Sequence, residues 1–191
     1  MRFPFVMMLA AALALGGCVP LVAGAGGAAI IGAAQDRGLE QAVDDNEISF
    51  EINRKLLAED SSLYRGVATQ VRKGRVLLSG YVPKAEDRAT VTRVVWTIGG
   101  VKEVINELHV GEGPGFSQNM SDSSITTSLR TRLMGDEHVD SINYSLKTQR
   151  GIIYILGTAK SQSELDRVLA HARDISGVRN VVSYVDFTTG K

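Results

Sequence analysis

Residues 74–80 read Gly-Arg-Val-Leu-Leu-Ser-Gly, and residues 151–157 read Gly-Ile-Ile-Tyr-Ile-Leu-Gly. Each stretch is an apolar run between two glycines, and the second lies 77 positions after the first. The same offset aligns residues 48–110 with residues 125–187 without a gap, and the identities fall on glycine and apolar positions. The chain therefore contains an internal repeat.

The two copies are separated by residues 111–121, which begin Gly-Glu-Gly-Pro-Gly and have the composition of a linker. This predicts a first domain over residues 44–110 and a second over residues 122–191. Domains of this size bury little core for their length. We therefore expect the two copies to pack against each other.

Each copy begins with a helical pattern in which an apolar residue recurs at every fourth position. The positions are Ile48, Ile52 and Leu56 in the first copy, and Ile125, Leu129 and Leu133 in the second. Asp44 and Asp122 precede these stripes, and we predict that they are the N-terminal caps of the two helices.

Two β-rich runs follow the helix in each copy. They are interrupted by Lys73-Gly74 in the first copy and by Arg150-Gly151 in the second, so each pair predicts a hairpin with a tight turn. A second helix is predicted from near Pro83 and from near Ser161, and a last strand follows it. The predicted strands are 67–71, 75–82 and 101–110, then 144–148, 152–159 and 178–187.

The second helices also carry terminal motifs. Ser161 and Glu164 fit a capping box, and Gly100 and Gly177 are predicted to end the two helices. The resulting order is αββαβ, twice, which defines an α+β fold. In each copy two helices should cover one face of a three-stranded sheet. Gly80 and Gly157, inside the second strand, should permit close backbone packing there.

Composition narrows the class of protein. Of 191 residues, 44% are hydrophobic and 22% are charged, as in a folded protein. Lys plus Arg and Asp plus Glu both number 21, so the basic excess of a nucleic-acid binder is absent. The one cysteine excludes an internal disulfide and a CxxC zinc pair.

The amino-terminal residues 1–17 have the features of a signal peptide, with Arg2 before a long apolar run. The run ends Leu-Gly-Gly-Cys at residues 15–18, which resembles a bacterial lipobox. We expect cleavage before Cys18 and acylation of this residue, and several acyl chains would anchor the protein stably. The alternatives are an ordinary signal peptide with an incidental cysteine, or an uncleaved anchor.

Residues 18–43 are then expected to form the lipid anchor and a Gly/Ala-rich tether. Residues 19–34 carry no charge, but after cleavage they are short for a membrane span and contain four glycines. Val19 follows Cys18, where an aspartate would retain the protein at the inner membrane. This indicates an outer-membrane lipoprotein that faces the periplasm.

The chain offers little for catalysis. The three histidines, His109, His138 and His171, lack metal-ligand spacing, and no nucleotide-binding loop or nucleophile motif is present. The carboxylate pairs 59–60 and 136–137 occur at the same place in both copies, which favours a repeated, solvated turn over an acid–base pair. We expect no enzyme, no metal and no cofactor.

The two glycine-bounded runs, together with Ile-Gly-Gly-Val-Lys-Glu-Val at residues 98–104 and Ile-Ser-Gly-Val-Arg-Asn-Val at residues 175–181, resemble the BON domain of bacterial envelope proteins. The resemblance implies two αββαβ modules in a non-catalytic protein. It further implies binding to anionic phospholipid and support of outer-membrane integrity.

By the same resemblance, the first helix of the second domain, residues 123–134, would face the phospholipid. The expected contact residues on its outer side and flanks are Ser124, Thr127, Ser128, Arg130, Thr131 and Arg132. An aromatic residue is expected near Ser124, and none lies within residues 123–134. The alternative is that Arg130 and Arg132 belong to an ordinary solvated helix face.

A second hypothesis is a scaffold that docks proteins of the outer-membrane assembly machinery through its exposed strand edges or helices, without binding lipid headgroups. Trp96 lies off the apolar stripe of the first domain's second helix. It would fill an interface between the domains or contact a partner, and the remaining alternative is plain exposure to solvent.

Overall fold

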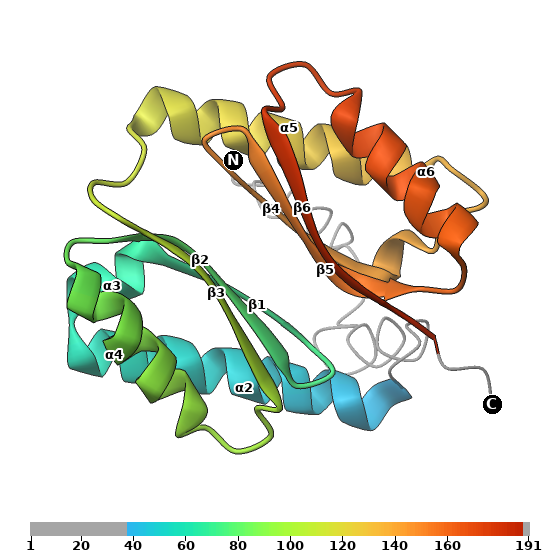
Figure 1. The fold of residues 1–191 in the computed structure, drawn as a ribbon. Helices are drawn as coiled ribbons and strands as arrows, with labels where there is room; N and C mark the ends of the chain where they lie inside the picture. Colours follow the sequence, from blue (N-terminus) through green and yellow to red (C-terminus); the bar gives the residue numbers. More distant parts are fainter. Residues whose placement is uncertain (1–37, 189–191) are drawn as a thin grey trace, which may run out of the picture.

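The computed structural model describes residues 38–188, and the signal peptide, Cys18 and most of the tether lie outside these residues. The two repeats form two α+β domains in tandem, as expected (Figure 1). The first contains α2 (Gly38–Glu59), α3 (Ser61–Gly66), β1 (Val67–Arg72), β2 (Arg75–Val82), α4 (Ala85–Trp96) and β3 (Glu103–Val110). The second contains α5 (Phe116–Met134), the 3₁₀-helix η1 (Ser141–Asn143), β4 (Tyr144–Gln149), β5 (Ile152–Ala159), α6 (Gln162–Arg173) and β6 (Asn180–Phe187).

Both sheets have the same three-stranded topology. The second strand of each domain is central, antiparallel to the strand before it and parallel to the strand after it. The register is also repeated, since Val76 pairs with Val104 in the first sheet and Ile153 pairs with Val181 in the second. Residues 77 positions apart in the sequence thus occupy equivalent positions in the two sheets.

The sheets pack face to face, and the helices form the two outer layers of the molecule (Figure 1). Leu77, Tyr154 and Leu156 form the buried centre between the sheets. This arrangement explains the unbroken apolar runs of β2 and β5, because each central strand is covered on both faces. The expectation that the two copies pack on each other is confirmed.

Polar contacts surround this centre. The Arg75 guanidinium lies 2.6 Å from the Asp186 carboxylate and donates to the Tyr184 carbonyl at 3.1 Å. The Tyr184 hydroxyl donates to the Glu107 carboxylate, and these two residues occupy equivalent positions of the repeat. Burial, and then the hydrogen bond to Glu107, raise the pKa of Tyr184 to about 12, so that its hydroxyl remains a donor at neutral pH.

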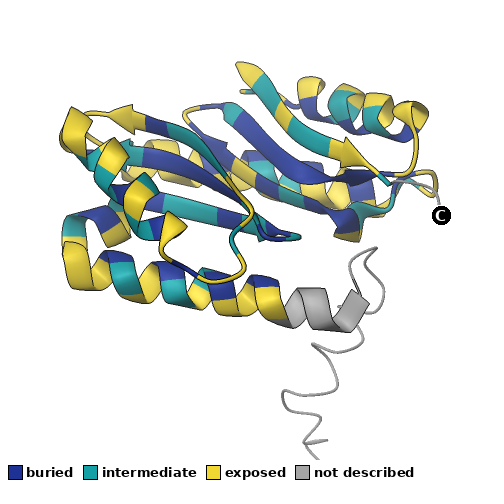
Figure 2. Cartoon of the chain, turned by 60° about the horizontal axis from the view of Figure 1, so that its bottom comes forward, coloured by how far each residue is buried: buried dark blue, intermediate teal, exposed yellow. Residues whose placement is uncertain are grey.

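The helices cover the outer face of each sheet with the stripes expected from the sequence. The six stripe residues are at most 4% exposed and belong to two separate cores, one for each domain. Figure 2 shows the central strands almost wholly buried, while buried and exposed residues alternate along the helices. This is the pattern of amphipathic helices on a sheet.

The predicted hairpin turns are confirmed, and they require unusual backbone angles. Lys73 and Gly74 have φ of 55° and 77°, and Arg150 and Gly151 have φ of 48° and 75°. Two successive positive φ values define a type I′ turn, which matches the twist of a hairpin. The close approach expected at Gly80 is also present, since a Cβ there would lie 2.1 Å from the Gly66 carbonyl oxygen.

The predicted N-terminal caps are wrong, because both helices begin earlier than their stripes. α2 includes Asp44, which is exposed, and α5 begins at Phe116, within the range expected to be linker. Asp122 therefore lies in the interior of α5, where it is 4% exposed. Its equivalent in α2 is Asp45, which is 2% exposed, and not Asp44.

These two buried aspartates bind the hairpin turns. The Asp45 carboxylate accepts hydrogen bonds from the backbone N–H groups of Lys73 and Gly74, both at 2.9 Å. The Asp122 carboxylate accepts from Arg150 N at 2.7 Å and from Gly151 N at 2.9 Å. Each aspartate thus joins the first helix of its domain to the hairpin turn.

The ends of the second helices differ in detail from the prediction. Ser161 caps α6 by accepting from Glu164 N at 3.1 Å, but the Glu164 carboxylate accepts from Lys160 N and Asp140 N instead of closing the capping box on Ser161. Gly100 and Gly177 have positive φ, as helix-ending glycines do, yet they lie four residues beyond Trp96 and Arg173, where the helices end.

Replacement of either buried aspartate should destabilise its domain. We expect Asp45→Ala and Asp122→Ala each to lower the free energy of unfolding by about 2–4 kcal/mol, because two charge-assisted hydrogen bonds are lost and two turn N–H groups lose their acceptor. Asp44→Ala, at the exposed neighbour, should change it by less than about 0.5 kcal/mol. Urea unfolding followed by circular dichroism measures these free energies of unfolding. Equal effects of Asp44→Ala and Asp45→Ala would contradict the role of Asp45 in binding the hairpin turn.

Candidate functional site

α5 exposes large apolar side chains at both of its ends. Phe116, Met120 and Met134 are 82%, 59% and 71% exposed. At about 100° of rotation per residue the three positions lie within about 40° of one another on the helix. Because α5 begins at Phe116, the helix contains an exposed aromatic residue, although it lies eight positions before Ser124, where the resemblance implied one.

Between these apolar residues the same side of α5 carries hydroxyl groups. Ser124, Thr127 and Thr131 are exposed, as predicted, and they share an arc of about 80° with the three apolar residues. Ser128 is half-buried and lies at the border of this arc. We refer to this surface as the outer face of α5, and it consists of Phe116, Met120, Ser124, Thr127, Thr131 and Met134.

The two predicted arginines do not lie together. They are two positions apart in the sequence, which is about 200° of rotation, so they lie on different flanks of the helix. The Arg132 guanidinium forms an ion pair of 2.6 Å with Asp174, at the end of α6. At the equivalent positions of the first domain, Lys55 donates to the Thr97 hydroxyl at 2.7 Å. Arg132 thus occupies a position that joins the two helices in both domains.

Arg130 has a different environment. Its guanidinium makes no hydrogen bond or ion pair with the described residues. It lines a hollow of about 300 Å³, to which the exposed apolar residues Met134 and Ile142 also contribute. A cation beside apolar side chains suits a negatively charged group that carries hydrocarbon. Of the two arginines, Arg130 is therefore the better candidate for binding an external anion.

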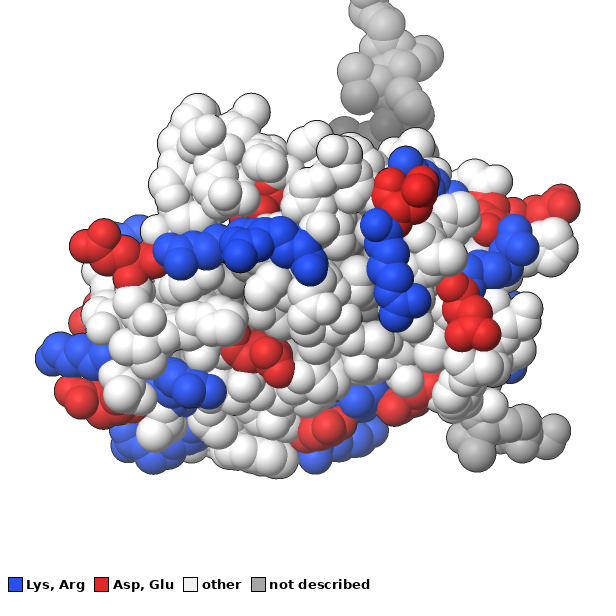
Figure 3. Space-filling model, turned by 45° about the horizontal axis from the view of Figure 1, so that its top comes forward, with Lys and Arg blue, Asp and Glu red and all other residues white. Residues whose placement is uncertain are grey.

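The charge of α5 distinguishes it from the other long helices. Its one acidic residue, Asp122, is buried, whereas α2, α4 and α6 each carry exposed carboxylates. Elsewhere on the face that bears α5 and α6, basic and acidic side chains are interspersed and much of the surface is uncharged (Figure 3). An anionic surface that approached α5 would meet no repelling carboxylate on that helix.

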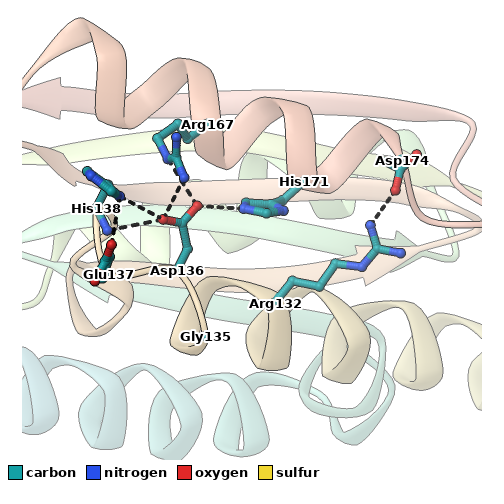
Figure 4. Close-up of a pocket in the computed structure, with 8 residues that line it drawn as sticks. All are labelled: Arg132, Gly135, Asp136, Glu137, His138, Arg167, His171 and Asp174. Atoms are coloured by element: carbon teal, nitrogen blue, oxygen red, sulfur yellow. Dashed lines mark hydrogen bonds and ion pairs between the residues drawn. The ribbon is translucent and has the colours of Figure 1, made fainter.

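A second cluster lies where α5 ends and α6 passes beside it (Figure 4). The Asp136 carboxylate accepts from Arg167 Nε and Nη2 at 3.0 and 2.9 Å, and from the His138 backbone N–H at 3.1 Å. His171 Nε2 lies 2.8 Å from the same carboxylate. The cluster lines an open pocket of about 700 Å³.

The interpretation of residues 136–137 as a solvated turn is wrong for Asp136, whose side chain is only 6% exposed, and holds for Glu137, which is 89% exposed. The hydrogen bonds from Arg167, followed by that from His171, hold the pKa of Asp136 far below its ordinary value. A carboxylate that stays ionised in this way is a poor general base at neutral pH. Its evident role is to join α5 to α6.

The remaining residues singled out in the sequence are dispersed. His109 Nε2 lies 3.2 Å from the Tyr154 hydroxyl, at the rim of the interface between the sheets. Residues 38–188 contain no group of three acidic, histidine or cysteine residues placed to hold a metal. Within the same residues, no helix is both long and apolar enough to cross a membrane.

Trp96 does not fill the interface between the domains. It is 52% exposed, and it lines a shallow groove with Arg88, Ala89 and Arg93 of α4. This position leaves two interpretations of Trp96 open, which are contact with a partner and plain exposure to solvent.

Two αββαβ domains with these sheets and motifs define the class of the protein. The BON domain family matches residues 44–112 and 121–189, and the chain belongs to this family. The outer membrane lipoprotein DolP of Haemophilus influenzae is 30% identical over 177 residues, which are 92% of this chain and 91% of that protein. The similarity between DolP and this chain therefore extends into the amino-terminal region.

Other relatives share the tandem domains. An uncharacterized protein of Anaplasma centrale is 34% identical over 144 residues, covering 75% of this chain and 94% of the relative. The osmotically-inducible protein Y of Escherichia coli is 26% identical over 144 residues, covering 73% of this chain and 70% of the relative. The chain is thus a DolP-like BON-domain protein of the bacterial envelope.

The Asp136 cluster predicts a dependence of stability on pH. Because the pKa of Asp136 is lowered in the folded chain, its stabilising effect is complete above its ordinary pKa of about 4 and is lost as the pH falls toward the folded value. Asp136→Asn should therefore unfold at lower urea concentration than the unaltered chain at about pH 5, and the difference should narrow toward about pH 3.

Glu137→Gln is the matched control for this measurement. Its side chain is 89% exposed, so its unfolding midpoint should follow that of the unaltered chain at every pH. A difference between Asp136→Asn and the unaltered chain that does not change between about pH 5 and about pH 3 would show that the carboxylate charge is not the source of the stabilisation.

Proposed function

We propose that this chain is a non-catalytic, lipid-anchored protein of the outer membrane, facing the periplasm, which binds anionic phospholipid through its second BON domain and supports the integrity of that membrane. The observation that carries the proposal is the outer face of α5. It combines exposed apolar side chains with hydroxyl groups and has no exposed carboxylate.

The residues of this face suit the boundary between headgroups and acyl chains. All six project toward the membrane, but the long side chains of Phe116, Met120 and Met134 can reach the apolar side of the boundary, whereas the short side chains of Ser124, Thr127 and Thr131 end among the headgroups. In this arrangement the helix lies parallel to the membrane surface. Apolar insertion then supplies more of the affinity than charge does.

The charge contribution comes from the flanks of the helix. Arg130 is available for a phosphate, and each basic residue near an anionic surface contributes about 1 kcal/mol. Arg132 and Ser128 lie nearer the other border, and Arg132 must share its guanidinium with Asp174. Such binding is weak by itself. An acylated Cys18 would strengthen it by holding the domains at high local concentration near the membrane.

The first test concerns the folded domains without the anchor. Residues 36–191 retain every residue that the structure describes. At low salt they should float with phosphatidylglycerol vesicles and not with phosphatidylcholine vesicles. Combined Phe116→Ser and Met120→Ser changes should reduce flotation by more than about tenfold, since full burial of one such side chain contributes about 1.5–3 kcal/mol.

Charge reversal separates the two arginines. Arg130→Glu should weaken flotation more than Arg132→Glu, because Arg132 is already paired with Asp174. Arg93→Glu is the control, because Arg93 is exposed on the first domain and its substitution changes the net charge by the same amount. Absence of flotation at low salt would contradict the proposal and favour the docking scaffold, for which Trp96 would be the first residue to test.

The second test concerns Cys18, which lies outside the described residues. In cells that are labelled with palmitate, the unaltered chain should carry the label and fractionate with the outer membrane. Cys18→Ala should lose the label in every case. It should pass to the soluble fraction if a signal peptidase of another type releases it, and otherwise remain as an unprocessed precursor. Label retained in Cys18→Ala would exclude this residue as the site of acylation.

A further inference from the structure

A cleft of about 510 Å³ lies between the two domains. Residues of the linker line it, and Figure 1 shows this linker crossing from β3 to α5. Both domains and the linker contribute to its walls. Its polar lining includes Arg65 and Thr69 of the first domain and Asn119, Ser123, Lys147 and Gln149 of the second. The cleft does not include the outer face of α5 or Arg130.

The cleft is positively charged. Arg65, at the end of α3, and Lys147, on β4, line it from opposite domains, and none of its lining residues is acidic. Neither cation forms an ion pair or a hydrogen bond with the residues that the structure describes. Both side chains are exposed, and the carboxylate whose charge acts on Arg65, that of Asp60, is not part of the lining. An anion in the cleft would therefore meet two cations and no lining carboxylate.

The walls also contain buried polar atoms without partners. Thr69 Oγ1 and Gln149 Oε1 find no hydrogen-bond partner among the described residues, and Gln149 is only 9% exposed. Buried polar groups are normally satisfied, because one left without a partner has given up its hydrogen bond to water and gained none in return. Both atoms are covered by protein atoms, so the Thr69 and Gln149 side chains must rotate before either group faces the cleft; the Thr69 hydroxyl and the Gln149 amide can then donate to an anion.

The lining therefore offers a guanidinium, an ammonium, hydroxyls and amides, which are donors suited to a phosphate group. A volume of about 510 Å³ exceeds that of inorganic phosphate and lies within the usual range for small-molecule sites. We propose that this cleft binds a small organic phosphate that bridges the two domains. A free sugar or glycerol phosphate and a phospholipid headgroup share this chemistry.

Calorimetric titration of the full chain in a neutral detergent with sn-glycerol 3-phosphate, at constant ionic strength, tests the proposal. Saturable binding is expected, and Arg65→Gln and Lys147→Gln should each weaken it by about tenfold or more, since a hydrogen bond to a charged group contributes about 1.5–3 kcal/mol. Arg93→Gln and Lys84→Gln, at exposed positions outside the cleft, are the matched controls and should bind as the unaltered chain does.

A soluble short-chain phosphatidylglycerol distinguishes the two sources of phosphate. Tighter binding than glycerol phosphate, with the same dependence on Arg65 and Lys147, identifies a lipid headgroup, and equal or weaker binding identifies a free metabolite. No saturable binding up to about 10 mM, or equal weakening in the control variants, would overturn the proposal. Because the cleft excludes the outer face of α5, vesicle flotation of Arg65→Gln and Lys147→Gln should be unchanged, and the two proposals can fail separately.

Discussion

The packing of the two sheets against each other is the constraint on which the other features depend. Each sheet has one face under its own helices, and its second face is buried only because the other domain covers it. Leu77 in the first sheet and Tyr154 in the second are equivalent positions, and both lie in this interface. The interface places α2 and α5 on opposite outer layers, so that α5 presents its exposed side to the surroundings. It also creates the cleft that Arg65 and Lys147 line from opposite sides.

Within each domain, one buried carboxylate connects the helix layer to the sheet. Asp45 and Asp122 accept the two N–H groups of a turn whose backbone angles leave those groups without partners in the hairpin. This interaction is the same in both copies, whereas the functional features are not. In the described part of α2, the charged residues Glu47 and Arg54 stand at the positions of Ser124 and Thr131. The Asp136 cluster is not repeated, because Thr90 and Val94 stand at the positions of Arg167 and His171. The repeat thus preserves the interactions that maintain the fold, and the two copies differ on their surfaces.

The two candidate sites have different chemistry although both involve α5. Its outer face is apolar and hydroxylated with an arginine at the border, which suits an extended membrane surface. Its side toward the first domain contributes Asn119 and Ser123 to a polar cleft, which suits a small anion. A ligand in the cleft would hold the two domains together, because it would contact both. The orientation in which α5 meets a membrane depends on the same contact between domains.

The sequence by itself determined two helices and three strands in each domain, because period-four stripes, glycine turns and a gapless repeat are local signals that survive any tertiary arrangement. The short α3 and η1 carry no such signal and were not predicted. It also identified Ser124, Thr127 and Thr131 as exposed, since they lie opposite Ile125, Leu129 and Leu133. The start of α5 at Phe116 was not predicted, because glycine and proline precede it and polar residues dilute its first turns. Pairing of Arg132 with Asp174, burial of Asp136 and the cleft at Lys147 were decided only by the tertiary structure. Each depends on which residues distant in the chain become neighbours, and neither composition nor periodicity contains that information.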